Sequence, residues 1–111
     1  MLSVEESSDA NWSDAGMADD IPRQGALVFK TRHGNVALFR TLDDEYFALL
    51  DRCPHRGGPL SQGIVHGCKI TCPLHGWHID LTTGSAVAPD VGQVRTFPVQ
   101  LRDNRLWVDF S

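Results

Sequence analysis

The sequence predicts an all-β fold in which antiparallel sheets form a sandwich or a barrel. Short runs rich in β-branched and aromatic residues recur along the chain and are separated by turn residues, whereas helical periodicity is almost absent. The connections between these runs are short, and antiparallel hairpins need only such local connections. The chain has 111 residues, close to the commonest size of a single domain. We therefore expect one β domain with a modest core.

The first half of the chain supplies the clearest strand signals. A short edge strand anchored by Trp12 is expected first, and the run YFALL is the last strand before a Gly- and Pro-rich segment. The segment His33-Gly34-Asn35 and the pair Asp43-Asp44 provide the turns between the longer runs. The strands expected here cover residues 11–14, 26–31, 36–41 and 46–50.

The second half alternates shorter strands with loops. One hairpin turns at His66-Gly67, and Thr82-Thr83-Gly84 ends the strand that follows it. A last hairpin is expected to turn at Asp103-Asn104. The strands expected here cover residues 64–65, 69–71, 78–81, 94–101 and 106–110.

Two Cys–His pairs, each in a Gly- and Pro-rich segment, indicate a metal site. Cys53 and His55 lie in CPHRGGPLSQG, and Cys72 and His75 lie in CPLHGW. Two thiolates and two imidazoles are the ligand set of a 2Fe–2S cluster in which His replaces Cys on one iron. Zinc accepts the same four ligands, but its paired ligands usually have two to four residues between them, unlike Cys53 and His55. We therefore favour an iron–sulfur cluster over zinc.

Glycines and prolines are expected to shape both loops. Gly57, Gly58 and Gly76 allow positive φ angles and close backbone approach, so that their N–H groups can point at the cluster sulfurs. Three prolines in the same segments restrict the backbone. Stiff loops of this kind lower the reorganisation that accompanies electron transfer.

On these two motifs the chain resembles the Rieske iron–sulfur proteins, and the resemblance covers residues 12–110. It implies that Cys53 and Cys72 bind one iron and that His55 and His75 bind the other. It also implies a three-sheet antiparallel fold that holds a Rieske-type 2Fe–2S cluster between two loops at one exposed tip. The domain boundaries that follow are an acidic, mobile tail over residues 1–10 and a Rieske domain over residues 11–111.

Four positions depart from the Rieske proteins of membrane complexes. Those proteins carry a disulfide between the two loops, where this chain has Gly58 and Leu74. They also place hydrogen-bond donors where this chain has Trp77 and Ile79. Because fewer donors stabilise the reduced cluster less, we expect a potential near the low end of the roughly −150 to +300 mV Rieske range. Protein-film voltammetry giving a value above zero would contradict this.

A finer resemblance concerns the electron-transfer partner. The run GGPLSQGIVHG, the APD that follows the second loop and the ending TFPVQLRDNRLWV look like the small subunit of assimilatory NAD(P)H-dependent nitrite reductase. This implies a partner, the large subunit with FAD, a 4Fe–4S cluster and sirohaem, which reduces nitrite to ammonium. The alternative is a Rieske-type ferredoxin that serves a ring-hydroxylating dioxygenase. No nucleophile, nucleotide cradle or substrate pocket is evident, so we expect no catalysis by this chain alone.

Composition and charge indicate where the protein is expected to act and which kinds of partner are not expected. No apolar run approaches the roughly 20 residues that span a bilayer, and no signal-peptide pattern opens the chain, so a cytoplasmic location and no membrane partner are expected. The net charge is −4, but the first 20 residues hold six of the 14 acids and no Lys or Arg. The rest of the chain has no basic stripe, which argues against nucleic-acid binding.

Other residues near the motifs receive plainer interpretations. Cys68 is read as a small residue in a hairpin and not as a redox sensor or a ligand. His66 is read as a turn residue, and His78 as a strand residue that faces solvent or stacks on the loops. Trp77 is read as packing under the second loop, with a docking role as the alternative.

Overall fold

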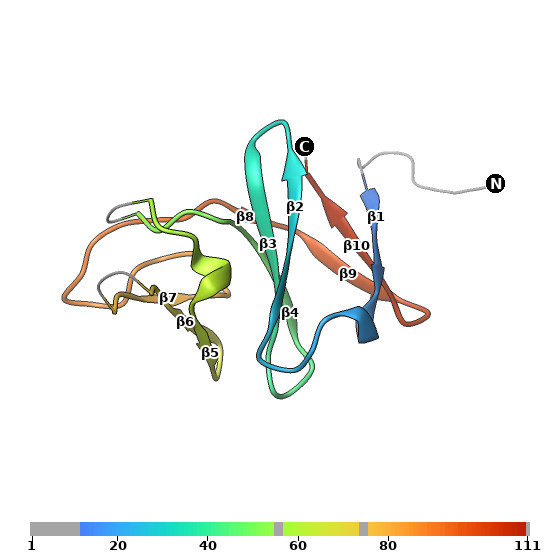
Figure 1. The fold of residues 1–111 in the computed structure, drawn as a ribbon, viewed down its shortest axis with the longest axis horizontal. Helices are drawn as coiled ribbons and strands as arrows, with labels where there is room; N and C mark the ends of the chain where they lie inside the picture. The colour runs from blue at the N-terminus through green and yellow to red at the C-terminus, as the bar shows by residue number, and fades with distance from the viewer. Residues whose placement is uncertain (1–11, 55–56, 74–75, 111) are drawn as a thin grey trace.

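The computed structural model describes residues 12–54, 57–73 and 76–110, and it confirms the all-β class. The described residues form ten strands in three antiparallel sheets (Figure 1). The strands are β1 (Trp12–Met17), β2 (Ala26–Thr31), β3 (Gly34–Arg40), β4 (Tyr46–Leu50), β5 (Ile64–His66), β6 (Lys69–Thr71), β7 (His78–Asp80), β8 (Thr96–Phe97), β9 (Val99–Arg102) and β10 (Arg105–Asp109). Two short 3₁₀ helices are η2 (Ala18–Asp20) and η3 (Leu60–Gln62).

The middle sheet, in the order β2-β3-β4-β8, divides the molecule into two cores. Strand β3 is buried on both faces because four consecutive apolar residues fill its centre. Ala37 and Phe39 belong to the core shared with β5, β6 and β7, whereas Val36 and Leu38 belong to the core shared with β1 and β10. Because successive side chains of a strand point to opposite faces, β3 contributes side chains to both cores.

The two outer sheets lie on either side of the middle sheet (Figure 1). One has the order β1-β10-β9, so the first strand of the chain pairs with the last. The other has the order β5-β6-β7 and buries one residue from each strand, namely Val65, Ile70 and Ile79. This second sheet lies beside the described residues that flank the two gaps in the Cys–His loops, so those loops share one end of the molecule (Figure 1).

One sequence expectation needs correction. Residues 94–101 were expected as a single strand, but the chain leaves the middle sheet after β8 and joins the first sheet as β9. The break falls at Pro98, which has no N–H for a sheet hydrogen bond and whose carbonyl instead accepts the Asp109 N–H at 3.0 Å. The proline thus lets one segment tie two sheets together.

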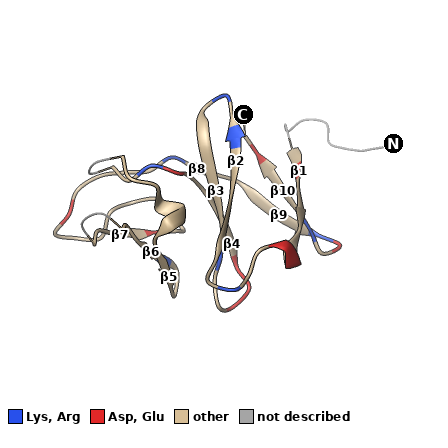
Figure 2. Ribbon diagram, viewed as in Figure 1, with Lys and Arg blue, Asp and Glu red and all other residues tan. Residues whose placement is uncertain are grey.

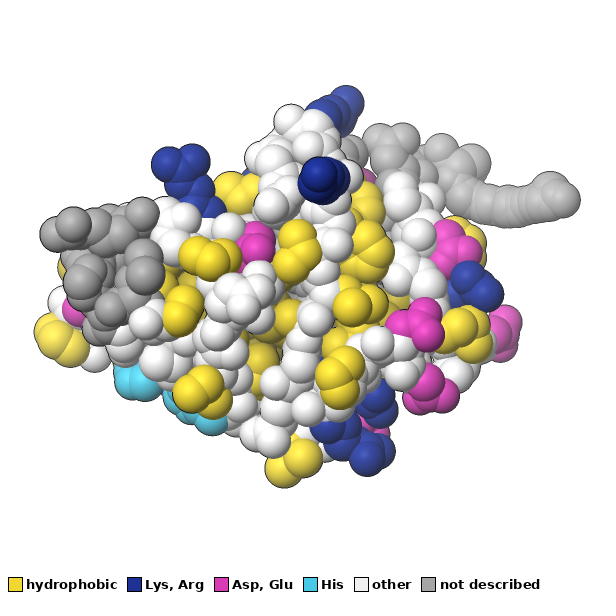
Figure 3. Space-filling view, viewed as in Figure 1, with side chains coloured by type: hydrophobic (Ala, Val, Ile, Leu, Met, Phe, Trp, Pro, Cys, Tyr) yellow, Lys and Arg dark blue, Asp and Glu magenta, His cyan; other side chains and the backbone are white. Residues whose placement is uncertain are grey.

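Charged residues are distributed unevenly over the fold. Figure 2 shows acidic positions in η2, in the β3–β4 turn and in the β9–β10 turn, and a further one in the loop between β7 and β8 at the end that holds the Cys–His loops. On the face drawn in Figure 3, most of the acidic side chains lie at the β1-β10-β9 end, and Lys and Arg side chains stand along the edge near the β2–β3 turn.

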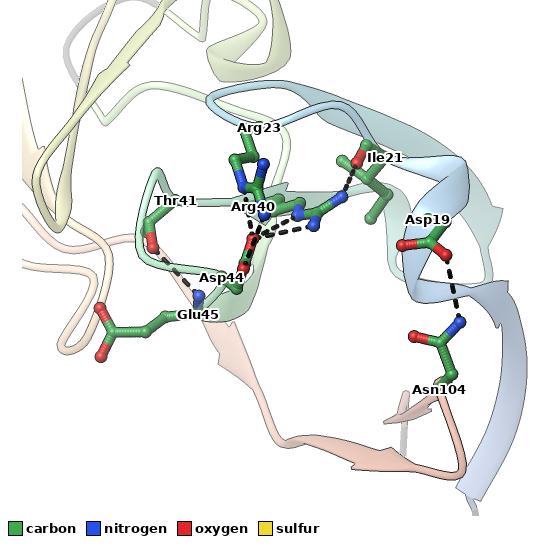
Figure 4. A network of polar contacts seen from close by, with 8 residues as sticks. All are labelled: Asp19, Ile21, Arg23, Arg40, Thr41, Asp44, Glu45 and Asn104. Atoms are coloured by element: carbon green, nitrogen blue, oxygen red, sulfur yellow. Dashed lines mark hydrogen bonds and ion pairs between the residues drawn. The ribbon is translucent and has the colours of Figure 1, made fainter.

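A carboxylate–guanidinium network fastens the segment after η2 to the β3–β4 turn (Figure 4). Asp44 accepts hydrogen bonds from Arg23 at 2.9 Å and from Arg40 at 3.0 Å, and Arg40 also donates to the Ile21 carbonyl at 2.7 Å. The hydrogen bond from Arg23, followed by that from Arg40, lowers the pKa of Asp44 to about 2. Arg23 and Asp44 are exposed, so their ion pair adds little to stability, whereas the Arg40 side chain is only 11% exposed.

Within the described ranges, no helix is both long enough and apolar enough to cross a membrane. The expected acidic tail over residues 1–10 lies outside the described residues, and the boundary between residues 10 and 11 stays a prediction.

Candidate metal centre

The two Cys–His loops share one hydrogen-bonding frame despite their different spacing. In the first loop the Cys53 N–H donates to the Gly58 carbonyl at 2.8 Å, and the Gly57 N–H donates back to the Cys53 carbonyl at 2.8 Å. In the second loop the Cys72 N–H donates to the Trp77 carbonyl at 2.7 Å, and the Gly76 N–H donates back to the Cys72 carbonyl at 3.1 Å. Each loop therefore closes at the fourth and fifth residues after its cysteine.

The glycine at the closing position is what makes this frame possible. Gly57 has φ +72° and Gly76 has φ +71°, the left-handed region that other residues enter at a cost. This confirms the expected positive φ at these two glycines, whereas Gly58, for which it was also expected, does not have a positive φ. It also corrects the expectation that their N–H groups face the cluster sulfurs, because both N–H groups are already bonded to the cysteine carbonyls.

Both cysteines present side chains suited to an iron–sulfur cluster. Cys53 is 1% exposed and Cys72 is 3% exposed, and both belong to the core shared with β5, β6 and β7. Neither is in a disulfide. Two buried thiols from separate loops with closely matched backbones fit a soft metal centre that is shielded from water.

The two histidines of the motifs lie outside the described residues. In the sequence, His55 stands two residues after Cys53 and His75 stands three residues after Cys72, so each precedes the closing glycine of its loop. The four predicted ligands therefore come from two loops whose described parts meet at one end of the fold (Figure 1). Their role as ligands stays a prediction.

The first loop has an additional anchor that the sequence analysis missed. Asp51 accepts hydrogen bonds from the Ser61 N–H and the Ser61 hydroxyl, both at 2.7 Å. These bonds span ten residues and hold the start of η3 against the end of β4. Leu60, the first residue of η3, is fully buried in the core around the two cysteines. An Asp directly after an apolar strand and a Ser ten residues later was the available signal.

A third segment packs against the first loop. A Cβ on Gly92 would lie 2.8 Å from Pro54 and 3.7 Å from Trp77, so the chain at Gly92 runs close to both cysteine loops. Trp77 is half-buried and packs on the core, as its plainer interpretation predicted. Val91, next to Gly92, is 86% exposed. The segment after the second loop therefore completes the surface around the centre.

The remaining polar residues of this end form two separate groups. The Thr71 hydroxyl lies 2.6 Å from His66 Nε2 and 2.9 Å from His78 Nδ1, so it joins three strands of one sheet. His66 is thus a strand residue and not only a turn residue.

Cys68 lies in the β5–β6 turn, where its thiol donates to Glu45 at 3.3 Å. This hydrogen bond, with burial as a smaller cause, raises the pKa of the Cys68 thiol. A raised pKa makes a thiol less reactive, which supports the plainer interpretation of Cys68.

Comparison with known protein families gives a match over most of the chain. The model of the Rieske [2Fe-2S] domain matches residues 11–98. Among curated proteins, the ferredoxin component of the naphthalene 1,2-dioxygenase/salicylate 5-hydroxylase systems of Ralstonia sp. is 33% identical over 97 residues, which cover 86% of this chain and 92% of that protein. The oxygenase component of dicamba O-demethylase from Stenotrophomonas maltophilia is 40% identical over 106 residues, which cover 87% of this chain and 30% of that protein.

Solved structures share the fold. A candidate small subunit of NADH-dependent nitrite reductase from Mycobacterium tuberculosis superimposes with a TM-score of 0.80 at 24% identity, covering 90% of this chain and 95% of that one. The present chain thus spans nearly all of small single-domain relatives and about a third of the larger oxygenase component.

Proposed function

Because this chain belongs to the Rieske [2Fe-2S] family and its cofactor is therefore a Rieske-type 2Fe–2S cluster, we propose that it is a one-electron carrier whose ligands are Cys53, His55, Cys72 and His75. The bound cluster supplies reversible uptake and release of a single electron. The observation that carries the proposal is the matched frame of the two loops, which buries one thiol from each loop in the same core.

The chain's own residues prepare the site for this role. The backbone hydrogen bonds of each loop are satisfied within the loop, so the frame is expected to keep its shape when the charge of the centre changes. The core beneath the two cysteines excludes water from one side. The proposed electron path therefore leaves through the loop ends, where a partner can approach.

For the partner, we favour the large subunit of an assimilatory NAD(P)H-dependent nitrite reductase, with the pair acting in the cytoplasm. The support is the resemblance of three segments, residues 57–67, 88–90 and 96–108, to the small subunit of that enzyme. Two of these segments surround the proposed centre, since residues 57–67 contain the end of the first loop and the segment 88–90 leads into Gly92 beside Pro54. Those are positions where a partner would make contact.

The decisive experiment is reconstitution. The chain, assembled anaerobically with iron and sulfide, should bind two irons and give the electron paramagnetic resonance signal of a mixed-ligand cluster when reduced. Added to the purified sirohaem flavoprotein subunit with NADH or NADPH and nitrite, it should form a stable complex and support ammonium production. A colourless, iron-free product would contradict the carrier proposal itself.

A second candidate partner is the oxygenase of a ring-hydroxylating system. The observation that favours it is the 33% identity to the Ralstonia ferredoxin component over 92% of that protein. On this candidate the reconstituted chain would form no stable complex with the sirohaem subunit. It would instead be reduced rapidly by a ferredoxin reductase and would pass electrons to a terminal oxygenase.

A further inference from the structure

Two histidines meet on the outer face of the β5-β6-β7 sheet, apart from the proposed iron–sulfur centre. His66 ends β5 and His78 begins β7, and Thr71 ends the strand β6 that lies between them. The Thr71 hydroxyl oxygen lies 2.6 Å from His66 Nε2 and 2.9 Å from His78 Nδ1. One nitrogen of each ring therefore points at the same small volume.

The two rings have a defined mutual geometry and are open to solvent. Their centroids are 5.2 Å apart, and the ring planes are nearly perpendicular, at 85°. Each of the three strands buries its middle residue, so alternation keeps the residues on either side of it on the outer face. His78 is exposed and His66 is half-buried, and Figure 3 shows histidine side chains on the surface at this end of the fold. An ion can therefore reach the pair from solvent.

Converging imidazole nitrogens are ligands for divalent transition metals such as Zn²⁺ and Cu²⁺. A Zn–N bond is about 2.0–2.1 Å long, so an ion shared by two nitrogens needs them within about 4 Å of each other. Both nitrogens already contact one oxygen, so a small rotation of the exposed His78 ring brings them to this spacing. The Thr71 hydroxyl donates to one nitrogen and accepts from the other. The ring that donates can move its proton to its other nitrogen, which frees both nitrogens for the metal.

We propose that His66 Nε2 and His78 Nδ1 bind a divalent transition-metal ion of the Zn²⁺ class at a site separate from the iron–sulfur centre. Among the described residues, no group of three or more His, Cys, Asp and Glu side chains is placed to hold a metal ion. Water molecules therefore complete the coordination, as in an open zinc site and unlike a closed structural one. The proposal goes beyond the proposed function and does not depend on which protein exchanges electrons with this chain.

Two charged residues of the same sheet act on an ion bound at the pair. His66 lies opposite Lys69 in the register of β5 and β6, and Lys69 lies opposite Asp80 in the register of β6 and β7. The lysine cation opposes the binding of a second cation, whereas the carboxylate of Asp80 favours it. Removal of the Lys69 charge should therefore strengthen metal binding, an effect that a purely structural contact between the two rings and Thr71 does not predict.

Isothermal titration calorimetry of the holoprotein with Zn²⁺ tests the proposal. The cluster has to be present, because free cysteines and histidines of the two loops would also bind Zn²⁺. The wild-type chain should bind one ion at this pair. His66→Gln and His78→Gln should each weaken binding at least about tenfold, because a single imidazole loses the gain from a second ligand held beside it. Iron content and visible absorption are measured for every variant and should stay constant.

Three further variants separate the ligands from their surroundings. His33→Gln is the matched control and should keep the wild-type affinity, since both ring nitrogens of His33 already have partners in the Phe110 carbonyl and Arg95. Thr71→Val keeps both imidazoles and removes a hydroxyl that is not a usual zinc ligand, so the affinity should change less than about threefold. Lys69→Gln should strengthen binding about threefold at low ionic strength.

A bound ion should also act on the centre through its charge. Thr71 directly precedes Cys72, and His78 begins the strand that leaves the second loop. Two positive charges at this position favour the reduced cluster, which carries one more electron than the oxidised cluster. At low ionic strength, Zn²⁺ should therefore raise the reduction potential of the wild-type holoprotein, and the same Zn²⁺ concentration should leave that of His78→Gln nearly unchanged.

Several results would overturn the proposal. Equal Zn²⁺ affinities of the wild type, His66→Gln and His78→Gln would place the bound ion elsewhere on the chain. A loss of binding in Thr71→Val as large as in the histidine variants would mean that two imidazoles do not suffice as ligands. Release of iron on addition of Zn²⁺ would show that the ion attacks the cluster. An unchanged potential of the wild-type holoprotein at saturating Zn²⁺ would contradict a site beside the second loop.

Discussion

The two cysteine loops have the same internal frame but differ in what holds them to the rest of the protein. The first loop is closed from outside by Asp51 and Ser61 and continues into η3, whose Leu60 is fully buried. The second loop runs between the short strands β6 and β7, and its flanking side chains Thr71 and His78 bond to each other across those strands. One loop is braced by a long-range carboxylate and the other by a sheet.

This difference shows how one local motif can be placed by two kinds of support. Backbone hydrogen bonds set the shape of each loop, and they join main-chain groups of the cysteine to those of the fourth and fifth residues after it. The position of each loop depends on contacts that lie outside the motif. We therefore expect mutations inside the two frames to act alike and mutations in the two supports to act differently.

The largest expected effect concerns Cys53 and Cys72, which should be equally necessary for cluster binding. Cys53→Ser and Cys72→Ser should each abolish cluster binding, because a serine hydroxyl is a poor replacement for a buried thiolate ligand. Iron and sulfide analysis after anaerobic reconstitution measures this. Cys68→Ser is the matched control and should keep two irons per chain, since that thiol bonds to Glu45 outside the loops. Loss of iron in all three variants would contradict the proposed ligand set.

Mutations in the contacts that support the two loops should lower stability by different amounts. Asp51→Ala leaves the part-buried Ser61 N–H and hydroxyl without their acceptor, which should cost about 2 kcal/mol of unfolding free energy. Asp80 makes a similar pair of bonds to Thr82, but these span only two residues in a local turn after the second loop. Asp80→Ala should therefore cost less than about 1 kcal/mol. Denaturant unfolding of the two holoproteins compares them, and equal losses would remove the distinction between the supports.

The closing glycines should share one cost of substitution and differ in a second. Gly57→Ala and Gly76→Ala each place a side chain at positive φ, at a cost of about 1 kcal/mol. A Cβ at Gly57 would also lie 3.2 Å from Arg52 Nε, whereas none of the described residues comes within 4 Å of a Cβ at Gly76. Gly57→Ala should therefore lower the free energy of unfolding slightly more than Gly76→Ala, because Arg52 must also shift, and denaturant unfolding of the two holoproteins measures this. Equal losses would mean that the Arg52 side chain adapts without cost.

The sequence predicted features that depend on neighbouring residues and missed features that depend on partners far away in the chain. Strands such as β2 and β4 were predicted at their observed bounds because alternation and turn residues are local signals. The break at Pro98 was missed because apolar residues on both sides of it continue one pattern while the chain changes sheets. The cysteines stood out in the motif, but Asp51 and Arg95 did not, because their partners Ser61 and His33 lie ten and 62 residues away.

The smallest expected effect tests the local support of the second loop by pH. The hydroxyl of Thr82 donates to Asp80 at 2.6 Å, and this bond is the main cause that lowers the pKa of Asp80 from its ordinary 3.8. A lowered pKa means that the stabilisation is complete above pH 3.8 and is lost as the pH falls through the lower folded value. Thr82→Val removes the hydroxyl and keeps the N–H, so an NMR titration of the Asp80 carboxyl carbon should show its pKa rising towards 3.8.

Thr83→Val is the control for that titration, since Thr83 acts on Asp80 only through its backbone N–H, which valine retains. The pKa of Asp80 should stay where it is in the wild type. If Thr83→Val moved this pKa as far as Thr82→Val, the turn would respond as a unit to any change in it. The second loop would then have a cooperative support after β7, comparable to the brace that Asp51 and Ser61 give the first loop.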